Sequence, residues 1–97
     1  MKNKFDISDF VNVETSQAVK CNLVERVKQR RKEKGFSQQE LASRSGVSYA
    51  SIRRFESKGD ISLSSLLKIA NAIGCLSDFN QLFKNPIFSN LEDLFND

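Results

Sequence analysis

Apolar side chains recur every three or four residues along most of this chain, and polar side chains fill the positions between them. The first such segment carries its apolar stripe at four positions: Val19, Leu23, Val24 and Val27. A stripe with a 3.6-residue period predicts an amphipathic helix. We expect Ser16 to be the N-cap of this helix and Gly35 to end it, after a basic last turn that suits the helix dipole.

A capping motif opens the next predicted helix. Ser37 and Glu40 form a Ser-x-x-Glu box, in which each side chain accepts a hydrogen bond from the backbone N–H of the other residue. Phe36 and Leu41 flank this box at the spacing of a hydrophobic staple. Gly46 ends the helix after about two turns, because glycine readily adopts the left-handed conformation that a tight turn needs.

Two further segments repeat this arrangement of a capping serine and a terminating glycine. The third predicted helix begins at the cap Ser48 and ends at Gly59, and the fourth begins at Ser62 and ends at Gly74. Ile52 and Phe55 are the expected buried side of the third helix, and the apolar residues of the fourth helix are Leu63, Leu66, Leu67, Ile69, Ala70 and Ile73.

A fifth helix is predicted near residues 77–83, and it completes an all-α domain of five helices over residues 16–84. Residues 1–15 precede this domain as an N-terminal arm, in which alternating apolar positions indicate a short strand or an ordered arm. Residues 85–97 form a C-terminal extension, in which a second Ser-x-x-Glu box at Ser89 predicts a short helix.

The net charge of +3 conceals a strongly basic centre. Residues 26–58 hold ten basic side chains against three acidic ones, for +7, whereas residues 1–25 and 59–97 carry −1 and −3. A basic centre between acidic ends is typical of a surface that binds a polyanion. The same run of charge is also compatible with an ordinary solvated helix face.

The residue types that are missing exclude several kinds of chemistry. The chain has no histidine, so it lacks the commonest general base and a common metal ligand. Cys21 and Cys75 are too far apart in sequence for a CxxC site, and we expect them to pack as small reduced hydrophobes. We therefore predict no enzyme activity, cofactor, metal site or small-molecule substrate. Free thiols and the lack of a long apolar run predict a cytoplasmic protein without a membrane partner.

The second and third helices, joined through Gly46, form a predicted helix-turn-helix, whose second helix can enter the major groove of DNA. If Ile52 and Phe55 face inward, the outer face of that helix carries two arginines, which can hydrogen-bond guanine O6 and N7, and residues suited to thymine methyl groups. The start of the preceding helix offers donors to a phosphate. The candidate DNA-binding residues are Ser37, Gln38, Ser48, Tyr49, Ala50, Ser51, Arg53, Arg54 and Lys58.

Purely structural roles also explain several of these residues. Ser37 and Ser48 cap helices whether or not DNA is bound. Tyr49, at a helix start, can pack against its neighbours, and Arg53 and Arg54 can be ordinary exposed charges.

The chain resembles the lambda repressor/Cro-like helix-turn-helix regulators, also called the XRE family, over about residues 20–83. The matching segments are RRKEKGFSQQELA (30–42), GVS (46–48), SIRRFE (51–56) and LKIANAIG (67–74). The resemblance implies a five-helix domain in which Gln38 clamps a phosphate and the candidate residues of the third helix face DNA. It also implies an ion pair between Arg31 and Glu56, which joins the first helix to the third.

The combined pattern predicts a transcriptional regulator, in the first instance a repressor, that binds double-stranded DNA as a homodimer. One recognition helix reads few base pairs, so two copies on half-sites about 34 Å apart, in a pseudo-palindromic operator, supply the missing selectivity. The apolar-rich segment 79–95 is the candidate dimer contact, although it can equally fold back as core.

Two other functions remain open from the sequence. The resemblance extends to HipB-like antitoxins, which neutralise a partner toxin such as a HipA-like kinase and repress their own promoter. Residues 4–13 and 91–95 are then the candidate partner surfaces, since neither belongs to the DNA-binding core. A controller of a restriction–modification system would share the same fold.

Overall fold

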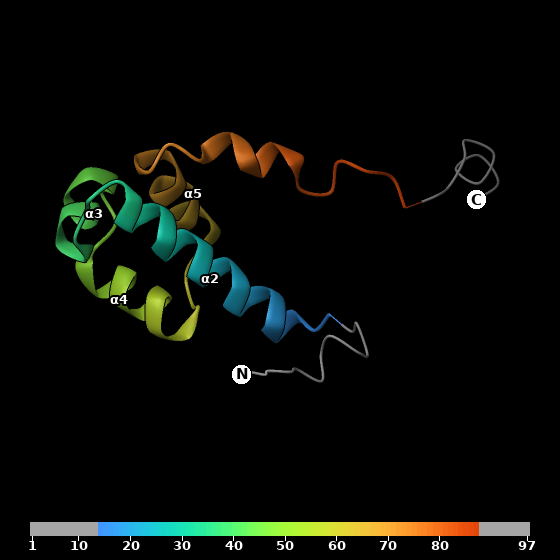
Figure 1. The fold of residues 1–97 in the computed structure, drawn as a ribbon, viewed down its shortest axis with the longest axis horizontal. Helices are drawn as coiled ribbons and strands as arrows, with labels where there is room; N and C mark the ends of the chain where they lie inside the picture. Colours follow the sequence, from blue (N-terminus) through green and yellow to red (C-terminus); the bar gives the residue numbers. More distant parts are fainter. Residues whose placement is uncertain (1–13, 88–97) are drawn as a thin grey trace.

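The computed structural model describes residues 14–87, which contain four α-helices and one 3₁₀ helix and no strand (Figure 1). With the labels of Figure 1, these are α2 (Ser16–Glu33), α3 (Gln38–Ser45), α4 (Tyr49–Lys58), α5 (Leu63–Ala72) and η1 (Leu76–Gln81). The predicted all-α fold of five helices is confirmed. The strand or arm expected before residue 14 and the helix expected from Ser89 lie outside the described residues.

Serine caps begin three of the helices as predicted. The hydroxyls of Ser37, Ser48 and Ser62 accept hydrogen bonds from backbone N–H groups three residues further on, at 2.9, 3.1 and 3.1 Å. The prediction for α2 was wrong by one residue, because Thr15 rather than Ser16 is its N-cap and accepts from the N–H of Ala18 at 3.0 Å. Thr15 has the extended backbone that a cap requires, whereas Ser16 is already helical.

The capping box at α3 is formed in one direction. Ser37 accepts from the backbone of Glu40, but the Glu40 carboxylate accepts from Arg44 Nε at 2.6 Å, one helical turn further on. This pairing follows from the i, i+4 spacing of the two charges on an exposed helix face. Arg44 in turn lies over the ring of Phe36, 4.5 Å from its centroid.

The turn between α3 and α4 depends on the backbone of Gly46. Its φ is 77°, in the left-handed region, and its N–H donates to the carbonyl oxygen of Ala42 at 3.0 Å. Nothing lies within 4 Å of the position that a Cβ would take, so the turn needs glycine for its conformation and not for space. Only Gly46, Val47 and Ser48 separate the two helices.

Two apolar clusters hold the helices together. The first lies where α3 packs against α4 and α5, and the second joins α2, α4 and α5. Both residues of each staple-spaced pair lie in the same cluster: Phe36 with Leu41, Val47 with Ile52, and Ile61 with Leu66. The buried members are Leu41, Val47, Ile52, Ile69 and Ile73 in the first cluster and Val24, Phe55 and Leu66 in the second.

The first turns of α2 extend beyond α4 and α5 (Figure 1) and bury little. Val24 is buried, but Val19 is 47% exposed, so the stripe expected on this helix is used only in part. Cys21 is exposed as well, and the expectation that it packs as a core residue was wrong; Cys75, by contrast, is half-buried against the first cluster. An apolar stripe is buried only where another element covers it.

The fifth helix differs from the prediction in type and in extent. It is a 3₁₀ helix over residues 76–81, and no side-chain cap hydrogen bond is present at its start, Cys75. Phe79 packs against the second cluster, whereas Leu82 has an extended backbone and Phe83 has a φ of 58° and is fully exposed. Short 3₁₀ segments are common where a chain leaves a helical core, and the chain leaves it here before residue 82.

None of the helices in residues 14–87 is both long enough and apolar enough to cross a membrane.

Candidate nucleic-acid interface

α2 and α4 border an open groove of about 710 Å³. Six of the side chains that line it are basic and one is acidic, so the groove is strongly positive. Its lining residues are Lys28, Arg31, Lys32, Gln38, Ala50, Arg53, Arg54, Glu56, Ser57 and Lys58. A positive groove between two helices is suited to an anionic backbone such as that of nucleic acid.

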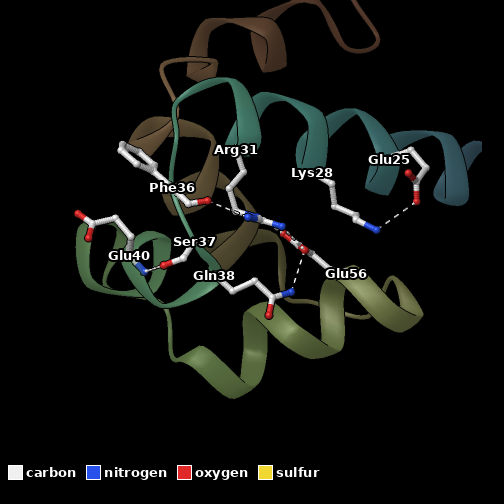
Figure 2. Close-up of polar contacts among 8 residues, drawn as sticks. All are labelled: Glu25, Lys28, Arg31, Phe36, Ser37, Gln38, Glu40 and Glu56. Carbon is white, nitrogen blue, oxygen red and sulfur yellow. Dashed lines mark hydrogen bonds and ion pairs between the residues drawn. The ribbon is translucent and has the colours of Figure 1, made fainter.

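An ion pair at the base of the groove ties α2 to α4 (Figure 2). Arg31 Nε lies 2.7 Å from Glu56 Oε2 and Arg31 Nη2 lies 3.0 Å from Glu56 Oε1, which makes the contact bidentate. The third nitrogen, Nη1, donates to the carbonyl oxygen of Phe36 at 2.7 Å. The side chains of Arg31 and Glu56 are only 10% and 4% exposed, so their charges compensate each other away from bulk water.

Gln38, the first residue of α3, also reaches this ion pair. Its Nε2 donates to Glu56 Oε1 at 2.9 Å, while its side-chain oxygen points away from Glu56 (Figure 2). The second N–H of this amide makes no hydrogen bond within residues 14–87. Gln38 is therefore held at the edge of the groove with one donor left for an anion.

Several opposing influences act on the pKa of Glu56. Burial alone would raise this pKa, but hydrogen bonds from Arg31 and Gln38, together with the charges of Arg31 and Lys28, hold it below its ordinary value of 4.5. The ionised carboxylate is thus the form that the folded protein stabilises.

This lowered pKa predicts a specific loss of stability in acid. A depressed folded-state pKa contributes stability above the unfolded value, and that contribution disappears as the pH falls through the folded value. We expect the difference in melting temperature between the wild type and Glu56→Gln to be largest near about pH 7 and to shrink below about pH 4.5. Thermal denaturation at several pH values measures this difference, and a difference that stays constant down to about pH 3 contradicts the assignment.

The two arginines of α4 have different surroundings. The guanidinium of Arg53 lies over the ring of Tyr49, 5.5 Å from its centroid, which is a cation–π distance. Arg54 instead pairs with Asp60, with 3.2 Å between Nη2 and Oδ2. Both arginines are exposed, and both line the groove.

The structure brings together five of the nine sequence-predicted DNA-binding residues in the groove: Gln38, Ala50, Arg53, Arg54 and Lys58. The other four are not among the groove-lining residues. Ser37 caps α3, and Ser48 caps α4 while its hydroxyl donates to that of Ser51 at 2.9 Å. Tyr49, on the first turn of α4, is 39% exposed.

The sequence-based selection missed two basic residues of the groove, Lys28 and Lys32 of α2. Lys28 is three residues before Arg31 and four residues before Lys32, spacings that place it beside both of them on the surface of α2. The expected ion pair with Glu56 places Arg31 next to α4. The spacing of Lys28 and Lys32 from Arg31 was therefore a signal that these two lysines also face the groove between α2 and α4.

The arrangement holds two kinds of chemical group side by side. The exposed face of α4 carries arginine forks and an aromatic ring, groups that can bind the edges of bases, and the lysines of α2 and α4 carry positive charge, which can bind phosphates.

Comparison with known proteins supports this interpretation. Residues 27–79, from the second half of α2 to η1, match the sequence model of a protein family described as Helix-turn-helix. The match covers more than half of the chain. No curated protein and no solved structure gives a significant match.

Proposed function

Because the chain belongs to the XRE-type helix-turn-helix family of DNA-binding regulators, we propose that it is a repressor that binds a specific operator as a homodimer. The observation that carries this proposal is the exposed face of α4, with Arg53 and Arg54, beside a positive groove that α2 completes. α4 is the second helix of the motif and enters the major groove of DNA.

The basic residues are of two kinds, arginines on α4 and lysines around the groove. This supports recognition of specific bases in addition to electrostatic attraction to the DNA backbone. Arg53 and Arg54 supply planar forks that match O6 and N7 of guanine, and Ala50 is exposed beside them, where a thymine methyl group fits. Lys28, Lys32 and Lys58 contact phosphates, which positions α4 without reading bases. The free N–H of Gln38 serves the same purpose at the start of α3.

The homodimer is argued from selectivity and from exposed apolar surface. One recognition helix discriminates too few base pairs against a genome of competing sites, and two-fold pairing doubles the number that is read. Leu82, Phe83 and Ile87 are 57%, 100% and 91% exposed. Large apolar side chains at such exposure favour a protein partner, and a second copy is the partner that the selectivity argument requires.

The same three apolar residues favour a second candidate function, in which a different protein covers them. In that case the chain is an antitoxin-type interaction protein that neutralises a toxin, such as a HipA-like kinase, and represses the shared promoter. DNA binding by α4 is common to both candidates, so the partner decides between them.

Selection of bound duplexes from a random DNA pool, at two salt concentrations, tests the proposal. We expect enrichment of a two-fold symmetric site with half-site centres about 34 Å apart. Light scattering should give twice the 11.0 kDa mass of one chain. Binding that fades with salt and enriches no motif would contradict the proposal. A symmetric site bound by a monomer would contradict the homodimer, and attention would turn to a second protein.

A further inference from the structure

One acidic side chain lies beside the recognition helix and contacts it. Asp60 follows α4 by two residues, and its carboxylate reaches back to Arg54, with 3.2 Å between Oδ2 and Nη2. The other carboxylate oxygen lies 3.8 Å from the Nζ of Lys20 on α2. Asp60 thus connects both helices that border the positive groove.

The turn at Gly59 explains how Asp60 comes to face α4. Gly59 has a φ of 79°, and its N–H donates to the carbonyl oxygen of Phe55 at 2.8 Å, so the chain reverses directly after the helix. The methylene groups of Lys20 lie over this glycine, and a Cβ there would be 2.9 Å from Lys20 Cγ and Cδ. The stem of Lys20 packs on the turn while its ammonium group approaches Asp60, so the carboxylate is held from two sides.

We expect this carboxylate to contribute little to the stability of the fold. The side chains of Arg54, Asp60 and Lys20 are 62%, 48% and 39% exposed, and exposed ion pairs contribute little to the free energy of unfolding. A negative charge at a surface that meets phosphates also opposes binding through like-charge repulsion. The position of Asp60 beside Arg54 is better explained by an effect on DNA recognition than by an effect on stability.

We propose that Asp60 is a positioning residue that sets the base specificity of Arg54 by holding its guanidinium for a bidentate contact with guanine. The proposal rests on the proposed function, because it concerns how the recognition helix reads its operator. Arg53, one residue earlier, lies against Tyr49 instead of a carboxylate.

The hydrogen-bonding geometry of arginine makes the two contacts compatible. A guanidinium carries five N–H donors, and Nη2 contributes one hydrogen to the edge shared with Nε and the other to the edge shared with Nη1. Asp60 Oδ2 accepts one of these two hydrogens, so the opposite edge keeps two parallel donors for guanine O6 and N7.

The same contact restricts where Arg54 can bind. An unheld arginine on an exposed helix has many rotamers, loses their entropy on binding and pairs readily with any phosphate. Asp60 removes part of this freedom before binding and repels phosphates from the same place. Both effects favour the correct base over a general anionic contact.

Asp60→Asn tests the proposal, with Asp78→Asn as the matched control. Asp78 is an exposed acidic residue of η1 that is absent from the groove lining, so its variant makes the same charge change away from Arg54. Affinities for the selected operator and for a random duplex are compared in equal salt. We expect Asp60→Asn to lower the ratio of operator to random affinity about fivefold, at the low end of a bidentate contact, and Asp78→Asn to leave it unchanged.

Base preference supplies a readout that a structural role would not move. Asp60→Asn should relax the selected site at the same base pair as Arg54→Ala, while its melting temperature stays close to that of the wild type. Asp60→Glu, which retains the carboxylate, should restore much of the preference. In the Arg54→Ala background, Asp60→Asn should not change the ratio further.

Two results would overturn the inference alone. In the first, the wild type enriches a clear site, and Asp60→Asn strengthens binding to operator and random DNA equally. Asp60 would then act only by repelling phosphates and would not position Arg54. In the second, the effect on the ratio persists without Arg54. A wild type that enriches no site at all overturns the proposed function, and this inference with it.

Discussion

Replacement of Glu56 by alanine is expected to lower the free energy of unfolding by about 3 kcal/mol, because it leaves the buried charge of Arg31 without its counter-ion. The side chain of Arg31 is only 10% exposed, so water cannot fully replace the lost carboxylate. Gln38 loses the acceptor of its 2.9 Å hydrogen bond in the same variant. Urea or thermal denaturation followed by circular dichroism measures the change.

Two further variants separate charge from packing. Glu56→Gln keeps the shape of the side chain and one acceptor, and is expected to be less destabilising than Glu56→Ala. In Arg31→Met/Glu56→Leu, neither charge is left unpaired, and the double variant should be more stable than Glu56→Ala, because an apolar replacement of a buried ion pair is often tolerated. A Glu56→Ala protein that melts like the wild type would show that the pair contributes nothing to the fold.

Removal of both recognition arginines should abolish most of the sequence preference. Arg53→Ala/Arg54→Ala removes two candidate guanine contacts, each of which contributes about 1–3 kcal/mol of discrimination against a wrong base. We expect the affinity for the selected operator to fall more than tenfold relative to that for random DNA, as measured by fluorescence anisotropy with labelled duplexes. The melting temperature should change little, because both side chains are exposed.

The groove supplies a matched control for this variant. Lys28→Ala/Lys32→Ala also removes two positive charges from the groove, but from α2. Its affinity should fall equally for operator and random DNA, and the slope of log affinity against log salt should decrease by about 2. If the arginine and lysine variants show the same uniform loss, Arg53 and Arg54 meet phosphates only.

Much of the fold was predictable because its signals are local. A capping serine and the N–H it satisfies are three residues apart, and a staple pair is five residues apart, so both are visible in the sequence of a single helix. Ser37, Ser48 and Ser62 all cap as expected. The two caps that differ from prediction also have local causes. Thr15, next to Ser16, caps α2 in its place, and Arg44 binds the Glu40 carboxylate that was expected to complete the capping box of α3.

The sequence predicted the residues of the candidate site only where helical periodicity alone decides which side chains point outward. Inward-facing Ile52 and Phe55 leave Ala50, Arg53 and Arg54 outward by helical periodicity alone. Lys28 and Lys32 were missed as groove residues because their role depends on how α2 packs beside α4. The exposure of Cys21 and Phe83 has the same origin, since each lies where no other described element covers the chain.

The sequence by itself determined the serine caps of α3, α4 and α5, the turn at Gly46, the inner face of α4 and the outward arginines of that helix. Periodicity and hydrogen bonds between near neighbours act within one helix, so they need no knowledge of the rest of the chain. Only the tertiary structure decided which basic side chains share a groove and that Asp60 pairs with Arg54. Pairs such as Gln38 with Glu56 and Lys20 with Asp60 join residues far apart in sequence, and only the packing of the helices brings them within reach.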